Sequence, residues 1–330
     1  MTKGNDRSMG KKDLRIVYMG TPDFAVEPLK KLVEGGYNVV GCITMPDKPA
    51  GRGHKIQFSP VKEYAIEKGI PLLQPEKLKD ETFQTDLKAW NADLQIVVAF
   101  RMLPESVWNM PRLGTFNLHA SLLPQYRGAA PINWAVINGE KETGVTTFFL
   151  THDIDTGNII LQEKTKIDES DNVGTVHDRL MTIGAELVTK TVDKILDGSV
   201  TTTQQSVLYK DLSELKPAPK IFKETCKIDF NEKAQRIHNL VRGLSPYPAA
   251  WCELLDQEGN ATAIKVFETE ILDSKTGGEP GTFTYDKKSI DVTTGEGTIR
   301  IKTLQYPGKK RLSTEEFLRG FRMDEISRFN

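Results

Sequence analysis

The chain has 330 residues, 27% of them charged, and a formal net charge of −1 at pH 7. A charge so close to zero argues against a general nucleic-acid binder, so any polyanionic partner would have to meet a local basic patch. No stretch approaches the ~20 apolar residues of a membrane span, which argues against a membrane protein, and the length leaves room for two domains.

Residues 1–12 are polar and basic without an apolar stretch, so they are predicted to form a disordered extension and not a secretory signal. The three cysteines show no Cys-x-x-Cys spacing, which favours a reducing, cytoplasmic setting. The five histidines form no His-x-x-x-His pair beside an acid, so no metal site is expected.

The first third of the chain alternates between strand and helix patterns. Residues 14–19 form an apolar run that predicts a buried strand, followed by a helix over 25–34 and a second strand over 38–44. Residues 94–100 are almost continuously apolar, as in a central parallel strand covered on both faces. This opening is Rossmann-like, but it lacks Gly-x-Gly-x-x-Gly, which argues against the alternative of a nicotinamide-dependent dehydrogenase.

Residues 46–62 separate two of these elements and are rich in glycine, proline and positive charge. Their four basic residues, set against a single acid, are Lys48, Arg52, Lys55 and Lys62. Composition alone favours a solvated surface loop. Long loops in compact domains are, however, usually functional or disordered, so a mobile basic loop beside a ligand site is the second interpretation.

Polar side chains follow two predicted strands further along. Residues 115–118 read as a strand, and its alternation places Asn117 and His119 on one side. Residues 144–150 form another strand that ends shortly before Asp155. Since ligands bind at the carboxyl ends of strands in open α/β sheets, these three side chains are predicted to share a site. The alternative is a structural histidine and an ordinary Asp-Thr-Gly turn.

Such a trio suits acyl transfer. An amide can donate to a developing oxyanion, an imidazole can relay a proton, and a carboxylate can fix the tautomer of the imidazole and raise its pKa. No serine or cysteine nucleophile is needed if the substrate supplies an amine.

The motifs around these residues resemble the signature of the folate-dependent formyltransferases. They read Asn-x-His-x-Ser-Leu-Leu-Pro-x-Tyr-Arg-Gly from Asn117, then Thr-Gly-Val-Thr from Thr143 and Asp-Thr-Gly from Asp155. The resemblance implies that Asn117, His119 and Asp155 are catalytic and that 10-formyltetrahydrofolate is a co-substrate, with no tightly bound cofactor. It also implies a folate pocket shaped by Ser121, Leu122, Leu123 and Pro124.

The basic loop resembles one found in the members of this family that act on initiator methionyl-tRNA, where Arg52 matches a recognition arginine. The resemblance thus implies the tRNA as partner, contacted by Arg52 and by Lys48, Lys55 and Lys62. Formyltransferases of amino-sugar nucleotides and formyltetrahydrofolate hydrolases share the three catalytic residue types but lack the loop, and they are the closest alternatives.

The rest of the chain is predicted to change architecture. Residues 173–196 form a long amphipathic helix that closes a catalytic domain over 13–198, and residues 199–219 read as a linker. Short strand patterns punctuated by glycine follow in 220–330. The resemblance implies an OB-like β-barrel that binds tRNA, and a monomer is expected.

Overall fold

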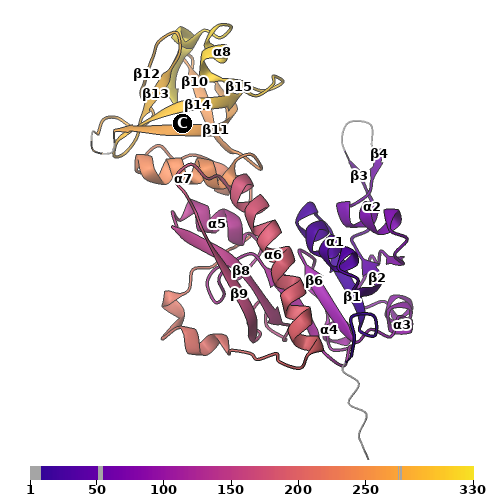
Figure 1. Ribbon diagram of the computed structural model, residues 1–330. Coiled ribbons are helices and arrows are strands. Elements are labelled where there is room, and N and C mark those ends of the chain that lie inside the picture. Colours follow the sequence, from indigo (N-terminus) through magenta and orange to yellow (C-terminus); the bar gives the residue numbers. More distant parts are fainter. Residues whose placement is uncertain (1–8, 51–54, 274, 276) are drawn as a thin grey trace, which may run out of the picture. The chain divides into compact units, whose positions relative to one another are not determined.

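The computed structural model describes residues 9–50, 55–273, 275 and 277–330 (Figure 1). The chain divides into two compact units. The first comprises Met1–Gly128, Gly144–Thr165 and His177–Pro217, and the second comprises Ala129–Thr143, Lys166–Val176 and Ala218–Asn330. The second unit therefore takes in two segments that the sequence analysis placed in the catalytic domain, because they pack with residues far along the chain.

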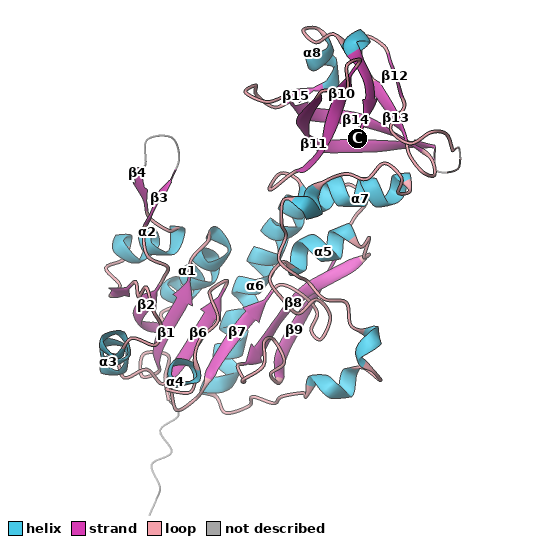
Figure 2. Cartoon of the chain, turned by 180° about the vertical axis from the view of Figure 1, so that it is seen from behind, coloured by secondary structure: helices cyan, strands magenta, loops and turns pink. Residues whose placement is uncertain are grey.

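The first unit is built on a seven-stranded sheet with the order β5-β2-β1-β6-β7-β8-β9. Its strands are β1 (Arg15–Gly20), β2 (Asn38–Ile43), β5 (Leu72–Leu73), β6 (Leu94–Val98), β7 (Thr115–His119), β8 (Glu142–Phe149) and β9 (Ile159–Lys166). The neighbours from β5 to β7 pair in parallel, whereas β8 runs antiparallel to β7. Figure 2 shows β1, β6 and β7 side by side in this sheet. The predicted mostly parallel, Rossmann-like sheet is confirmed.

Helices cover the sheet where its strands are most apolar. They are α1 (Val26–Glu34), preceded by the 3-10 turn η1 (Asp23–Ala25), α2 (Pro60–Glu67), α3 (Glu81–Ala89), α4 (Glu105–Trp108) and α6 (Val173–Leu196). All five residues of β6 are buried, and Val97 packs in a cluster with Phe83 and Leu87 of α3 and Val107 of α4. This burial is the physical reason for the continuous apolar run in the sequence. None of the described helices is long and apolar enough to cross a membrane.

The segment 46–62 forms a hairpin at its described residues. Strands β3 (Lys48–Ala50) and β4 (Lys55–Gln57) pair antiparallel, and Ser59 caps α2 by accepting a hydrogen bond from the backbone of Lys62. Arg52 lies outside the described residues. Residues 9–12 were predicted to be part of a disordered extension, but Lys11 accepts a hydrogen bond from Asn38 and its ammonium lies 4.3 Å from the Tyr37 ring centroid, so this part is docked. Residues 1–8 lie outside the description.

The second unit contains helices α5 (Pro131–Ile137) and α7 (Ala234–Leu244), which pack together, and a second sheet. The sheet has the order β12-β13-β14-β11-β10-β16, with β15 beside β14. Its elements are β10 (Ala250–Asp256), β11 (Ala261–Asp273), β12 (Phe283–Tyr285), β13 (Ile290–Thr293), β14 (Thr298–Gln305), β15 (Leu312–Ser313) and β16 (Ile326–Phe329), with the short helix α8 (Thr314–Leu318).

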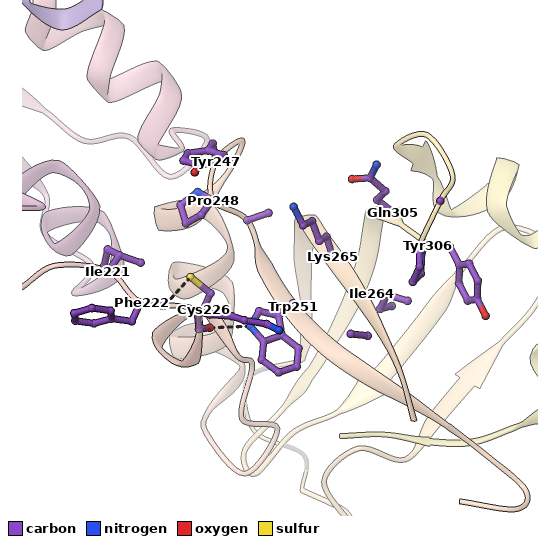
Figure 3. Close-up of a pocket in the computed structure, with 15 residues that line it drawn as sticks. Ile221, Phe222, Cys226, Tyr247, Pro248, Trp251, Ile264, Lys265, Gln305 and Tyr306 are labelled. Atoms are coloured by element: carbon purple, nitrogen blue, oxygen red, sulfur yellow. Dashed lines mark hydrogen bonds between the residues drawn. The ribbon is translucent and has the colours of Figure 1, made fainter. Parts of the chain in front are cut away.

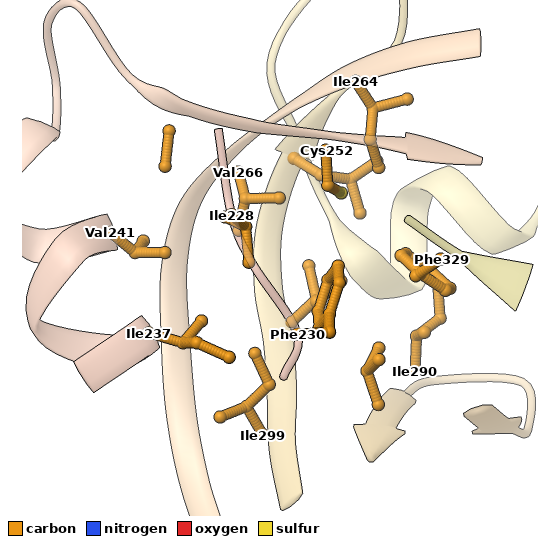
Figure 4. Packing of buried hydrophobic residues seen from close by; sticks show 14 of the residues in the cluster. Ile228, Phe230, Ile237, Val241, Cys252, Ile264, Val266, Ile290, Ile299 and Phe329 are labelled. Atoms are coloured by element: carbon orange, nitrogen blue, oxygen red, sulfur yellow. The ribbon is translucent and has the colours of Figure 1, made fainter. Parts of the chain in front are cut away.

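This second sheet curls into a nearly closed barrel. The backbone N–H of Phe329 in the last strand donates to the carbonyl of Gly281, two residues before β12, at 2.9 Å, which joins the two edges. The buried side chains of the barrel and of α7 form one core that includes Phe230, Ile237 and Val266 (Figure 4). The predicted barrel after residue 220 is therefore confirmed, although the short strands β12, β15 and β16 were not predicted.

Candidate active site

Strand β7 presents alternate side chains to the two faces of the first sheet. Leu118 faces helix α6, where a Cβ on Gly184 would lie only 2.8 Å from it. Asn117 and His119 therefore point to the opposite face, which is the alternation predicted from the sequence. His119 is 7% exposed and packs edge-on against the Phe148 ring, with 6.5 Å between the ring centroids.

The His119 ring is oriented by a backbone carbonyl. Its Nε2 lies 2.8 Å from the carbonyl oxygen of Tyr126, and because a carbonyl can only accept, Nε2 must carry the proton. The other nitrogen, Nδ1, faces Asp155 Oδ2 at 3.9 Å, which is an ion-pair distance and too long for a hydrogen bond. Asp155 was predicted to fix the tautomer of the imidazole, but the carbonyl of Tyr126 does so.

Asp155 reaches His119 by a different route from the one predicted. We expected the carboxyl ends of two strands to meet at one edge, but β8 is antiparallel to β7, so its last residue, Phe149, pairs with Phe116 near the start of β7. The chain then doubles back past Asp155. Gly157 permits this return, because a Cβ there would collide with the carbonyl oxygen of Phe149.

Asp155 is held in an unusual backbone conformation by several hydrogen bonds. Its φ of 55° lies in the left-handed region, which is unfavourable for a residue with a Cβ. The carboxylate oxygen Oδ2 accepts from the backbone N–H of Gly128 at 2.9 Å. The backbone carbonyls of Asp155 and Gly157 both accept from the Gln205 amide, each at 2.8 Å.

Gln205 links this carboxylate segment to Arg127. Its side-chain oxygen accepts from the guanidinium at 2.8 and 3.1 Å, while its nitrogen donates to the two carbonyls. Arginine only donates and carbonyls only accept, so the amide can stand in one orientation alone. Gln205 is 2% exposed. One buried amide thus connects the segment before the site to the segment that carries Asp155.

The arrangement consists of an amide donor, an imidazole nitrogen that can take up a proton, and a carboxylate. Among the described residues, no group hydrogen-bonds the side-chain amide of Asn117, so it is free to donate to a ligand. The carboxylate of Asp155 lies beside this imidazole, 3.9 Å from Nδ1. Such a set can stabilise an oxyanion and exchange a proton, as acyl transfer to an amine requires.

Comparisons with known proteins identify the family of the chain. The family model described as formyl transferase matches residues 14–192, and the model of the formyl transferase C-terminal domain matches residues 220–322. The chain belongs to the formyl transferase family. Its predicted family, read from the motifs around Asn117 and Asp155, is confirmed.

Relatives of this formyltransferase are similar along almost the whole chain. A methionyl-tRNA formyltransferase of Bacteroides thetaiotaomicron is 63% identical over 98% of this chain and 100% of its own length. The protein of the same name from Porphyromonas gingivalis is 49% identical over 95% of this chain and 97% of its own.

Solved structures share the fold at low identity. HypX from Aquifex aeolicus superimposes with a TM-score of 0.63 at 16% identity, covering 95% of this chain and 50% of the HypX chain. The sugar 3N-formyltransferase WlaRD gives 0.62 at 18% identity, covering 90% and 99%. At these identities the likeness concerns the fold alone.

The predicted folate residues of the formyltransferase are mostly buried. Ser121 is fully buried, and its hydroxyl donates to the Gln125 carbonyl at 2.7 Å. Leu123 is 2% exposed; its backbone N–H donates to Thr146 Oγ1 and its carbonyl accepts from Gln162. These bonds fix the path of the chain from His119 to the Tyr126 carbonyl. Pro124 is buried as well, and Leu122 is partly exposed.

The predicted tRNA residues differ in their surroundings. Lys48 is exposed on β3, whereas the side chains of Arg52 and Lys55 lie outside the description. The Lys62 side chain is 12% exposed, donates to Asp47 at 2.5 Å and lies 3.8 Å from the Phe58 ring centroid. Asp47 also accepts from Gln74 at 2.8 Å, and the bonds from Lys62 and Gln74 hold its pKa below the usual value. Lys62 therefore braces the base of the hairpin.

The segment 199–219 was predicted to be a linker, but it packs on the active-site loop up to residue 217. In addition to the bonds of Gln205, the carbonyl of Lys216 accepts a hydrogen bond from the backbone N–H of Tyr126 at 2.7 Å. The side chain of Gln125 donates to the carbonyl of Glu214 and accepts from the backbone N–H of Lys216, both at 2.8 Å. Sequence reasoning missed Gln205 because polar residues without periodicity resemble a solvated linker. Within the described parts of the chain, no three His, Cys, Asp or Glu residues are gathered as a metal site would require.

Proposed function

We propose that this formyltransferase transfers the formyl group of 10-formyltetrahydrofolate to the α-amine of methionine carried by the initiator tRNA. The observation that supports it most is the 63% identity, over the full length, to a protein named methionyl-tRNA formyltransferase. The free amide of Asn117 beside the His119–Asp155 pair supplies the chemistry. The HypX structure solved with tetrahydrofolic acid shares this fold, with a TM-score of 0.61 at 17% identity.

In the proposed mechanism the neutral amine attacks the formyl carbon, and the carbonyl oxygen becomes an oxyanion. Asn117 donates to that oxygen through its amide. His119 keeps Nε2–H on the Tyr126 carbonyl, so Nδ1 is the nitrogen that exchanges a proton with the reacting groups. The carboxylate of Asp155, 3.9 Å from Nδ1, stabilises the imidazolium. The attacking amine nitrogen gives its proton to His119 Nδ1, which passes it to N10 of the folate as the bond between the formyl carbon and N10 breaks, so that tetrahydrofolate leaves with N10–H.

Folate would bind beside the chain segment that turns from His119 to Gly128. Ser121, Leu123 and Pro124 act in this proposal by shaping the pocket from behind, since they are buried, and Leu122 is the one of the four with exposed surface. Folate is consumed and replaced in each cycle, so no tightly bound cofactor is required.

The hairpin β3–β4 is the proposed contact for the acceptor end of the tRNA. Arg52, Lys55 and Lys48 would meet phosphates or base edges, because arginine can fork onto a base in a way that lysine cannot. Lys62 acts indirectly by holding Asp47 and the hairpin base. The C-terminal barrel would bind the body of the tRNA, and we propose a cytoplasmic monomer.

Two alternatives are separated from this proposal by specific features. Small-amine formyltransferases such as those of sugar nucleotides share the fold, but the hairpin with its basic residues favours a polyanionic acceptor. A dehydrogenase would need a glycine fingerprint after β1, where the chain instead reads Gly-Thr-Pro-Asp-Phe.

One assay tests the proposal directly. The protein is incubated with 10-formyltetrahydrofolate and either methionyl-initiator tRNA or methionyl-elongator tRNA, and formylmethionine is measured after hydrolysis of the ester. We expect rapid formylation of the initiator and little of the elongator. Equal or absent reaction with both tRNAs, together with formylation of an amino-sugar nucleotide, would overturn the assignment.

A further inference from the structure

The second unit carries a groove of about 690 Å³ on the surface of its barrel (Figure 3). It is lined by residues 221–223 and 226, by residues 247–249 and 251, and by parts of β11 and the turn after β14. Four aromatic side chains take part: Phe222, Tyr247, Trp251 and Tyr306. The lining also contains two lysines, Lys223 and Lys265, and no carboxylate.

Two of the four aromatic side chains of this groove are exposed to solvent. Tyr247 is 80% exposed and Phe222 57% exposed. Tyr247 stands between two prolines, Pro246 and Pro248, which restrict the backbone on either side. Large exposed aromatic surface next to other apolar groups marks an interaction site more often than plain surface.

Trp251 lines the groove and has two lysines near its ring. Its indole N–H donates to the Lys223 carbonyl at 2.8 Å, which sets the plane of the ring. The ammonium groups of Lys223 and Lys227 lie 5.5 and 5.4 Å from the ring centroid. Lys227 is already paired with Glu253, whereas Lys223 and Lys265 form no ion pair with any other described residue.

The positive charge of the groove differs from the charge of its domain, in which acidic and basic residues are nearly equal in number. Residues 220–330 contain nearly as many acidic as basic residues, so a lining with two lysines and no acid is a local separation of charge. An apolar peptide would not need the lysines, and a cationic ligand would be repelled. Aromatic faces next to unpaired ammonium groups are the chemistry that binds unpaired nucleotides, by stacking on the base and by attraction to the phosphate.

We propose that this groove binds an unpaired nucleotide segment of the tRNA, with a base stacked on Tyr247 and a phosphate held by Lys265. The inference rests on the proposed function for the identity of the RNA. Base-paired regions do not fit this role, because their bases are already stacked on their neighbours and expose only edges.

The test measures binding of a fluorescein-labelled, unstructured oligoribonucleotide by anisotropy, with the same strand annealed to its complement as competitor. Tyr247→Ala should weaken binding roughly 5- to 150-fold, the usual range for loss of one base stack. Lys265→Gln should weaken binding and reduce the slope of log K against log salt by about 0.7, which corresponds to one phosphate of a single strand.

Matched controls lie on the same unit outside the groove. Tyr285→Ala removes another exposed aromatic residue, 47% exposed on β12, and Lys288→Gln removes another exposed lysine. Both should bind the oligonucleotide like the parent. Tyr247 is on the surface, so its variant should keep the thermal midpoint of the parent, which is measured alongside.

The proposal is overturned if the groove variants and the controls bind alike, or if the duplex competes as well as the single strand. A change of oligomeric state in Tyr247→Ala with unchanged RNA binding would also overturn it, since the groove would then join copies of the chain. Formylation of methionyl-tRNA is assayed separately on the parent protein. If the parent protein formylates methionyl-tRNA and the groove variants bind RNA as the parent does, only this inference is refuted. If the parent protein binds RNA through the groove but does not formylate methionyl-tRNA, only the proposed reaction is refuted.

Discussion

Replacing Gln205 by glutamate should uncouple Asp155 from its support without disturbing the neighbouring arginine. Glutamate has nearly the same shape, and its carboxylate can still accept from Arg127, which now donates at 2.8 and 3.1 Å. It cannot donate to the carbonyls of Asp155 and Gly157, which both lose their hydrogen bond from the amide. Two carbonyls would instead face a negatively charged oxygen.

The expected size of the effect follows from the geometry of the pair that Gln205 supports. At an effective dielectric constant of about 20, unit charges at the observed 3.9 Å attract by about 4 kcal/mol. If Asp155 relaxes from its left-handed conformation and its carboxylate retreats by ~2 Å, the attraction falls by roughly 1.4 kcal/mol, which is a tenfold loss in rate. The unsatisfied carbonyls should also lower the free energy of unfolding by about 1–3 kcal/mol each.

Steady-state formylation of methionyl-tRNA and urea unfolding measure the two effects separately. We expect Gln205→Glu to lower kcat about tenfold or more, with the KM for the folate within about twofold of the parent, because the bond to Arg127, in the segment beside the proposed folate site, is kept. The matched control is Gln204→Glu, which makes the same charge change at the exposed neighbouring residue and should behave like the parent. A folded Gln205→Glu protein with the parent's kcat would show that Gln205 does not position Asp155.

Four further predictions concern other parts of the chain. Asn117→Ala, His119→Ala and Asp155→Ala should each lower kcat by about 10²–10³ while tetrahydrofolate still binds by calorimetry, and near-normal turnover would remove that residue from the site. Arg52→Lys should impair formylation of the initiator although the charge is kept, and deletion of residues 50–55 should abolish it while folate binding persists; parent rates in the deletion variant would favour a small-amine acceptor. Burial raises the pKa of Cys42 to about 12 and raises the pKa of Cys226 and Cys252 too, so the native protein should show no fast-reacting thiol towards Ellman's reagent at pH 8, against three after denaturation. Activity should survive dialysis against a chelator, with tRNA folding controlled separately, and a loss that added zinc restores would contradict the metal-free mechanism.

Elements with a strong local pattern were predictable from the sequence. The helix expected over residues 173–196 is observed as α6 with the same bounds, and the strand expected over 94–100 is observed as the fully buried β6, which ends at Val98. The direction of β8 was not predictable, since an alternating pattern is the same whether a strand runs parallel or antiparallel to its neighbour. The expected meeting of two carboxyl ends was wrong for that reason.

Local composition was misleading for polar residues whose partners lie many positions away in the sequence. Lys62 was counted as one of four basic residues of the segment. Its ammonium, however, donates a hydrogen bond to Asp47, the single acid of the segment, and this pair connects the start of α2 to the base of the hairpin. Gln205 was predicted to be part of a polar linker, yet it is buried and hydrogen-bonded to Asp155 and Arg127, which lie 50 and 78 positions earlier in the sequence. Neither the partner of Lys62 nor the partners of Gln205 could be inferred from the composition of the surrounding segment.

The signature from Asn117 to Gly128 acts largely through its backbone. The carbonyl of Tyr126 orients His119, and the N–H of Gly128 holds the Asp155 carboxylate, so main-chain groups place two of the three side chains that we propose to be catalytic. Those groups are aimed correctly because Tyr126 and Gly128 both have positive φ, 58° and 125°. The buried Ser121 and Leu123 fix the preceding turn, and residues 205–216 secure the loop from outside. Most residues of the motif therefore build the frame, and Asn117, His119 and Asp155 are the side chains that, in our proposal, this frame presents to the substrate.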